Sequence, residues 1–129
     1  MEAPKAVVDR VRAHQQFESS IREICDRLEN KMPITASALL AIAEPARKSE
    51  LMEKYARLGK HVERNIKAFK TSSHKAVAIL KELKSPKPNW PSVERGLDRA
   101  LEIASRIERD FKDIELAIDQ ILAACQGGS

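Results

Sequence analysis

The chain has little glycine, few aromatic residues and no long hydrophobic run. It contains four glycines in 129 residues, and aromatic residues make up 4% of the composition. The longest uninterrupted apolar run, Ala38 to Ala43, has six residues, whereas a membrane-spanning helix needs about 20. The opening residues lack the apolar core of a secretory signal. We therefore expect no transmembrane segment, no glycine-rich phosphate loop and a cytoplasmic location.

Cysteine is scarce as well. Cys25 and Cys125 lie too far apart in the sequence to match a metal-ligand spacing or a Cys-x-x-Cys redox motif. Both fall on apolar faces of predicted helices, where a reduced thiol packs as a small hydrophobic group. The sequence predicts two buried free thiols and leaves open a disulfide near one end of the fold.

Helix-forming residues dominate the rest of the chain, and the last third carries the clearest pattern. Apolar residues recur there at alternating spacings of four and three, as in a helix that packs along one seam. The pattern predicts a helix over residues 91–125, with Asn89 and Ser92 as candidate N-terminal caps. The seam consists of Val93, Leu97, Ala100, Ala104, Ile107, Phe111, Ile114, Ile118, Ile121 and Cys125.

Two further long helices follow from a similar rhythm. The first covers residues 4–30 and is broken at Lys31-Met32-Pro33, after which a short apolar segment, 34–43, is expected to cross the end of the bundle. The second covers residues 46–84 and ends at the proline-rich linker 85–88. Its apolar row reads Leu51, Tyr55, Leu58, Val62, Ile66, Phe69, Ser73, Ala76, Leu80 and Leu83.

The predicted fold class is all-α. We expect an antiparallel up-down-up bundle of three long helices plus one short crossing helix, with residues 1–126 as a single domain and 127–129 as a flexible tail. The alternative is a four-helix bundle with a break near residue 72, where Thr71-Ser72-Ser73 is poor in helix formers. Gly59 marks a position where a neighbouring backbone is expected to approach closely.

Positive charge is concentrated in the middle of the chain. Residues 47–87 contain twelve Lys or Arg and four acidic residues, a local charge of +8 in a protein whose total is +4. Residues 88–129 sum to −3. The excess is therefore either a docking surface for an anionic partner or the counterpart of the acidic last helix. Helical spacing places the candidate anion-binding residues opposite the apolar row: Arg57, Lys60, Arg64, Lys67, His74 and Lys81.

No catalytic, cofactor-binding or metal-binding motif is present in the sequence. His14, His61 and His74 are not spaced as metal-ligand pairs, and His14 is expected to be a satisfied core residue. No Ser-His-Asp or Cys-His arrangement can be assembled, and no cofactor is expected. The sequence therefore predicts a non-enzymatic protein.

Its partner is expected to be another protein, bound by an adaptor or scaffold module. The alternatives are non-specific binding to a nucleic-acid backbone and binding to an anionic membrane surface, and self-association stays open. Ser85, which precedes Pro86 in a basic linker, is a candidate regulatory phosphorylation site. Apolar residues off the seam of the last helix form a candidate partner surface: Leu101, Ile103, Leu116 and Leu122.

Overall fold

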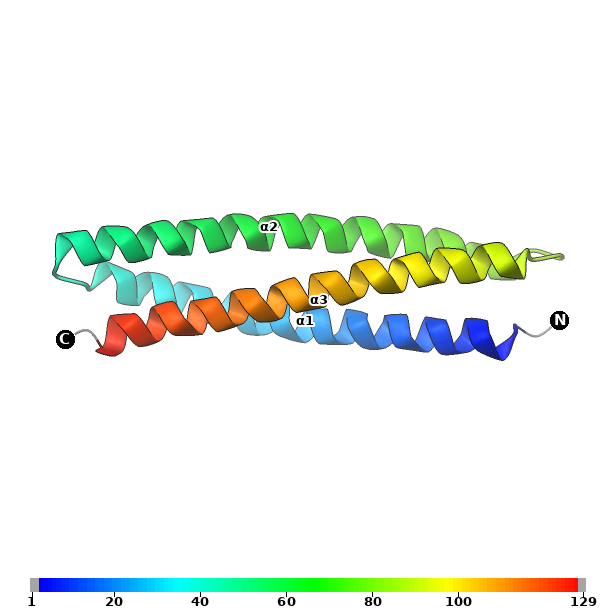
Figure 1. Ribbon diagram of the computed structural model, residues 1–129, viewed down its shortest axis with the longest axis horizontal. Helices are drawn as coiled ribbons and strands as arrows, with labels where there is room; N and C mark the ends of the chain where they lie inside the picture. Colours follow the sequence, from blue (N-terminus) through cyan, green and yellow to red (C-terminus); the bar gives the residue numbers. More distant parts are fainter. Residues whose placement is uncertain (1–2, 128–129) are drawn as a thin grey trace.

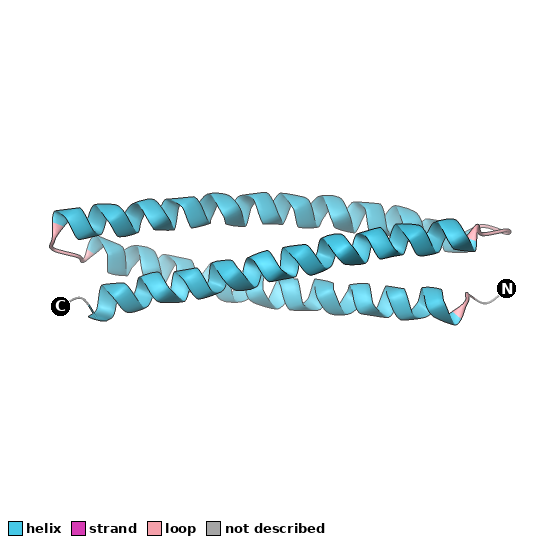
Figure 2. Cartoon of the chain, viewed as in Figure 1, coloured by secondary structure: helices cyan, strands magenta, loops and turns pink. Residues whose placement is uncertain are grey.

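The computed structural model describes residues 3–127 as three long helices in an extended bundle (Figure 1). Helix α1 spans Lys5–Leu40, α2 spans Pro45–Lys81 and α3 spans Trp90–Gly127. A single 3-10 turn, η1 (Glu82–Lys84), follows α2. Between residues 3 and 127 there are only helices and short connections, without strands (Figure 2). The predicted all-α bundle is confirmed. Of the predicted tail, Gly127 is the last residue of α3 and residues 128–129 lie outside the described part.

Helices α2 and α3 each begin with a side-chain cap. The carboxylate of Glu44 accepts hydrogen bonds from the backbone N–H groups of Ala46 (3.1 Å) and Arg47 (2.7 Å) at the start of α2. The side-chain oxygen of Asn89 accepts one from the N–H of Ser92 (3.2 Å), as the sequence predicted for the last helix. These caps satisfy backbone donors that the first turn of a helix leaves unpaired.

The first helix does not stop at residue 30, so the predicted short crossing helix is wrong. Residues 34–40 belong to α1, which runs through Pro33. A proline inside a helix removes one backbone hydrogen bond and costs about 3 kcal/mol. That cost is offset because Thr35 and Leu39 continue the inward face of Leu28, and both are fully buried (0% and 1% exposed). Pro33 itself is on the exposed side.

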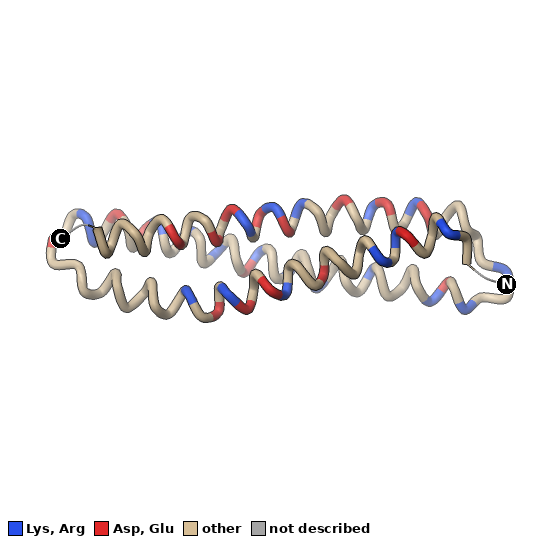
Figure 3. The backbone as a smooth tube through the Cα atoms, turned by 90° about the horizontal axis from the view of Figure 1, so that it is seen from below, with Lys and Arg blue, Asp and Glu red and all other residues tan. Residues whose placement is uncertain are grey.

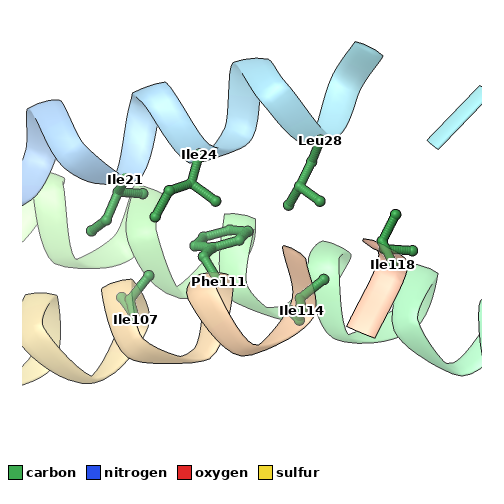
Figure 4. Close-up of a cluster of buried hydrophobic side chains, with 7 residues drawn as sticks. All are labelled: Ile21, Ile24, Leu28, Ile107, Phe111, Ile114 and Ile118. Carbon is green, nitrogen blue, oxygen red and sulfur yellow. The ribbon is translucent and has the colours of Figure 1, made fainter. Parts of the chain in front are cut away.

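Helix α3 is the centre of the core. The first nine residues of its predicted seam, Val93 to Ile121, are all buried, and Cys125 is half-buried. In the middle of the bundle the ring of Phe111, 0% exposed, lies among aliphatic side chains of α1 and α3 (Figure 4). Trp90 packs beside Val7 and Val93 at one end, and Leu39, Leu51 and Ile121 form a cluster at the other. The heptad prediction for the last helix is therefore confirmed along its length.

Helix α2 is continuous through residue 72, which excludes the predicted alternative of a break there, but it is much less buried than its neighbours. Only Leu51, Ser72 and Ala76 are buried in α2. Beyond Val62 the inward row differs from the predicted one by one residue. Ser72 is buried in place of Ser73, and Ile66 is left 36% exposed. The observed row keeps the strict four-three spacing of the α3 seam, which lets the two helices stay in contact along their length.

The close approach predicted at Gly59 is wrong. Apart from its chain neighbours and the backbone of its own helix, a Cβ atom at Gly59 would have no heavy atom within 4 Å. The close approach occurs at Gly96 in α3, where a Cβ would lie 2.9 Å from the Cδ1 atom of Ile79. The missing side chain at Gly96 thus lets Ile79 of α2 pack directly against the α3 backbone.

Ion pairs join α1 to α3 along the bundle. Arg10 Nε lies 2.7 Å from Asp98 Oδ1, and Arg27 Nε lies 2.7 Å from Glu115 Oε2. Lys31 Nζ lies 3.1 Å from both Glu115 Oε2 and Asp119 Oδ1. Higher-numbered residues of α1 pair with higher-numbered residues of α3, so these two helices run parallel. Helix α2 runs in the opposite direction between them in the chain (Figure 1). The hydrogen bond from Arg27, followed by that from Lys31, holds the pKa of Glu115 below its ordinary value of 4.5.

Replacing the helix-interior proline is expected to stabilise the protein. Pro33→Ala restores a backbone donor at an exposed position of α1, and we expect the free energy of unfolding to rise by about 1–3 kcal/mol. Urea denaturation followed by circular dichroism measures this change. A loss of stability would show that α1 needs a break at residue 33.

The Glu115 cluster predicts a pH dependence of stability. Because the pKa of Glu115 is lower in the folded than in the unfolded chain, its contribution is complete above pH 4.5 and is lost as the pH falls below that value. Wild-type protein should therefore lose more stability between pH 7 and pH 3 than the variant Glu115→Gln, as measured by urea midpoints at both pH values. Equal losses in the two proteins would contradict the role assigned to Glu115.

Candidate anion-binding face of α2

The six candidate anion-binding residues lie on the outer side of α2. Arg57, Lys60, Arg64, Lys67, His74 and Lys81 are all exposed. We call this set the α2 basic row. At a rise of about 1.5 Å per residue, the row extends for roughly 36 Å along the helix. Its side chains project outward because the opposite face of α2 packs against α3 through Leu51 and Leu58.

Most of the α2 basic row has no ionic partner. Arg57 pairs with Glu53 within the helix at 2.6 Å, and Lys54, beside the row, pairs with Glu50 at 3.6 Å. Within residues 3–127, Lys60, Arg64, Lys67 and Lys81 have no ion pair. Intrahelical pairs between exposed side chains contribute only about 0.3–0.5 kcal/mol each. The row therefore keeps most of its charge available to solvent.

The acidic residues of α3 that form ion pairs bind basic residues of α1 or of α3 itself, and none of these pairs in the described part of the chain involves the α2 basic row. Asp98, Glu115 and Asp119 each bind a basic residue of α1. Figure 3 shows basic and acidic positions along the rod and an uncharged run, residues 32–43, at the end of α1. Part of the acidic charge of the last helix thus has its counterpart in α1, and ion pairs with α3 do not account for the positive charge of the α2 basic row.

The four apolar candidates of the last helix do not share one environment. Ile103 packs against the central core cluster, so it widens the core. Leu101 and Leu122 are half-buried. Leu116 is 58% exposed, on the side of α3 that faces solvent. The structure therefore does not gather them into a single surface.

The remaining candidates of the sequence have mainly structural surroundings. Ser85 is half-buried directly after η1, and its backbone N–H donates to the carbonyl of Glu82 at 3.1 Å. His14 is buried with its Nδ1 atom 3.0 Å from a carboxylate oxygen of Glu18, as expected for a satisfied core histidine. In the described part of the chain, no three His, Cys, Asp or Glu residues are placed to hold a metal ion, and no helix is long and apolar enough to cross a membrane.

Both cysteines are free thiols, and both are half-buried where the sequence predicted burial. Cys25 packs against the central cluster, and Cys125 packs at the end of the bundle near Leu51 and Ile121. Their places in different clusters explain why they do not pair. Burial raises the pKa of the Cys25 thiol.

Grooves flank α2 on both sides, and none of them was predicted from the sequence. One groove between α2 and α3, of about 380 Å³, has an apolar floor and a rim that includes Lys54, Arg57 and His61. The groove between α1 and α2, of about 390 Å³, is lined by Cys25, Leu28, Glu29, Met32, Val62, Ile66 and Phe111. The signal that could have found the second groove is Ile66, an apolar residue that falls one place off the strict four-three spacing.

Comparison with known proteins adds no identification. No family model, no curated protein and no solved structure matches this chain.

Proposed function

We propose that this protein is a non-enzymatic interaction module, an adaptor or scaffold, that binds an acidic partner protein through the α2 basic row. One observation carries the proposal: three acidic residues of α3, Asp98, Glu115 and Asp119, pair with α1, while Lys60, Arg64 and Lys67 of α2 have no ionic partner among the described residues. A row of exposed and unpaired cations attracts an anionic surface at long range and orients it on contact.

Apolar residues beside the row favour a protein partner over a nucleic acid. Ile66, Val77 and Met52 of α2 are 36%, 53% and 41% exposed. Ile66 lines one shallow depression with three cations, Lys60, Arg64 and Lys67, and one acid, Glu63. Binding to a phosphate backbone needs clustered cations alone, whereas protein interfaces combine an apolar centre with a charged rim. The mixed surface therefore supports an acidic protein.

The proposed setting is the cytoplasm. Both cysteines are free thiols, as is usual in a reducing compartment. The proposed role involves no catalysis: the protein binds a partner and holds it in place.

Charge reversal in the α2 basic row should abolish partner binding. In the double variant Arg64→Glu/Lys67→Glu both side chains are exposed, so the fold is expected to persist. Arg12→Glu/Arg109→Glu is the matched control, since it makes the same change of net charge at exposed positions of α1 and α3. Affinity purification from cells of the source organism should recover a partner with wild type and with the control. With the row variant, recovery of the partner should fall by at least about tenfold, which corresponds to about 1.4 kcal/mol of binding free energy.

The salt and nuclease dependence of that recovery separates the alternatives. Capture of the partner should persist in moderate salt and after nuclease treatment. Equal loss in the row variant and the control would refute the proposal. Loss of all captured material after nuclease treatment, together with steep salt dependence, would assign the row to a nucleic-acid backbone.

A further inference from the structure

The groove between α1 and α2 is almost wholly apolar. Its floor is made by Phe111 of α3 and Leu28 of α1, which are 0% and 2% exposed. Its walls are the half-buried side chains of Cys25 and Met32 on α1 and of Val62 on α2. The groove exists because α1 and α2 each pack against α3 and make few direct contacts with one another.

The spacing of the inward row of α2 explains why the groove has an apolar wall on α2 but stays open. The four-three spacing turns Ser72 into the bundle and leaves Ile66 at the edge, where it is 36% exposed. Ile66 is therefore an apolar side chain on this flank of α2 that the central core cluster does not use. Apolar surface of this kind gains most by contact with another apolar side chain.

The groove is continuous with the α2 basic row. Ile66 lines the α1–α2 groove and also the depression formed with Lys60, Arg64 and Lys67. On the opposite wall the charged residue is Glu29 of α1. The depression on the α2 side thus has a net positive charge from three cations and one acid, Glu63, whereas the lining of the groove itself is apolar apart from Glu29.

We propose that this groove binds one amphipathic helix of an acidic partner protein. The apolar stripe of that helix fills the space between Val62, Met32 and Phe111, and its acidic flank contacts Arg64 and Lys67. Apolar anchors at spacings of three and four residues are the usual means by which a helix occupies a hydrophobic groove. The bound helix completes a four-helix bundle, in which α1 and α2 both acquire a neighbour on their open flank. The inference rests on the proposed function and adds the shape and charge pattern of the partner.

A pair of synthetic peptides tests the inference directly. The first peptide is an 18-residue helix with leucine at spacings of three and four and glutamate on one flank. The second carries lysine in place of each glutamate. We expect the glutamate peptide to bind the wild-type protein at least about tenfold more tightly than the lysine peptide, as measured by isothermal titration calorimetry.

Cysteine modification locates the bound peptide. Cys25 lines the groove and Cys125 lies at the far end of α3, outside it. Saturating glutamate peptide should slow alkylation of Cys25 by at least about tenfold, because it covers the thiol, and should change Cys125 by less than about twofold. Alkylation sites are read by mass spectrometry of the digested protein.

Two matched substitutions on α2 provide the second measurement. Ile66→Ser removes the apolar side chain that joins the groove to the row, and Val77→Ser removes an exposed one outside the groove. Ile66→Ser should weaken binding of the glutamate peptide by about fivefold or more, whereas Val77→Ser should leave it within about twofold. Both residues are exposed enough for the fold to persist.

The outcomes separate this inference from the proposed function. No binding of the glutamate peptide at 1 mM (about −4 kcal/mol), equal binding of both peptides, or unprotected Cys25 would overturn the groove assignment. If Arg64→Glu/Lys67→Glu still abolishes capture of the cellular partner in that case, the proposed function stands without the groove. If the free protein dimerises and thereby protects Cys25, the groove belongs to a second copy of this chain and the inference also fails.

Discussion

The parallel packing of α1 against α3 is the constraint on which the rest of the structure depends. Apolar side chains of both helices enclose Phe111, and the ion pairs of Arg10, Arg27 and Lys31 fix their register along the rod. A register shift would separate these charges and would also misalign the buried aliphatic residues. Since α1 and α3 are not consecutive in the chain, α2 must span the whole length of the bundle to join them. The length and direction of α2 follow from this pairing.

The distribution of charge follows from the same pairing. Three acidic side chains of α3 pair with α1 and none pairs with the α2 basic row among residues 3–127, so the cations of that row face solvent. Helix α3 has the most buried residues, α1 has fewer and α2 has the fewest. Helix α2, which buries the fewest residues, therefore also has the largest net charge of the three helices. In proteins that bind partners, such low-stability elements are commonly the ones that take part in recognition.

How far the sequence predicts this structure differs from helix to helix. The α3 seam was predictable because ten apolar residues keep one spacing without interruption. The continuation of α1 through Pro33 was not, because a local rule for proline cannot weigh the distant burial of Thr35 and Leu39. In α2 two rows, one through Ile66 and one through Ser72, fit the pattern nearly equally, and only the partner helix decides between them. The exposure of Arg64 and Lys67 followed from helical projection, whereas the α1–α2 groove depends on packing that no single helix determines.

The sequence separation of the best-packed helices has a consequence for how the chain reaches its native state. The interhelical pairs Arg10–Asp98 and Arg27–Glu115 each join residues 88 positions apart. Neighbouring helices in most small bundles form local hairpins, which keeps contact order low and folding fast. Here α1 and α2 make few contacts with one another, so a hairpin of these two helices gains little before α3 arrives. The consecutive helices α2 and α3 pack much more extensively, so a local hairpin of these two helices is expected to form first, with α1 docking onto it afterwards.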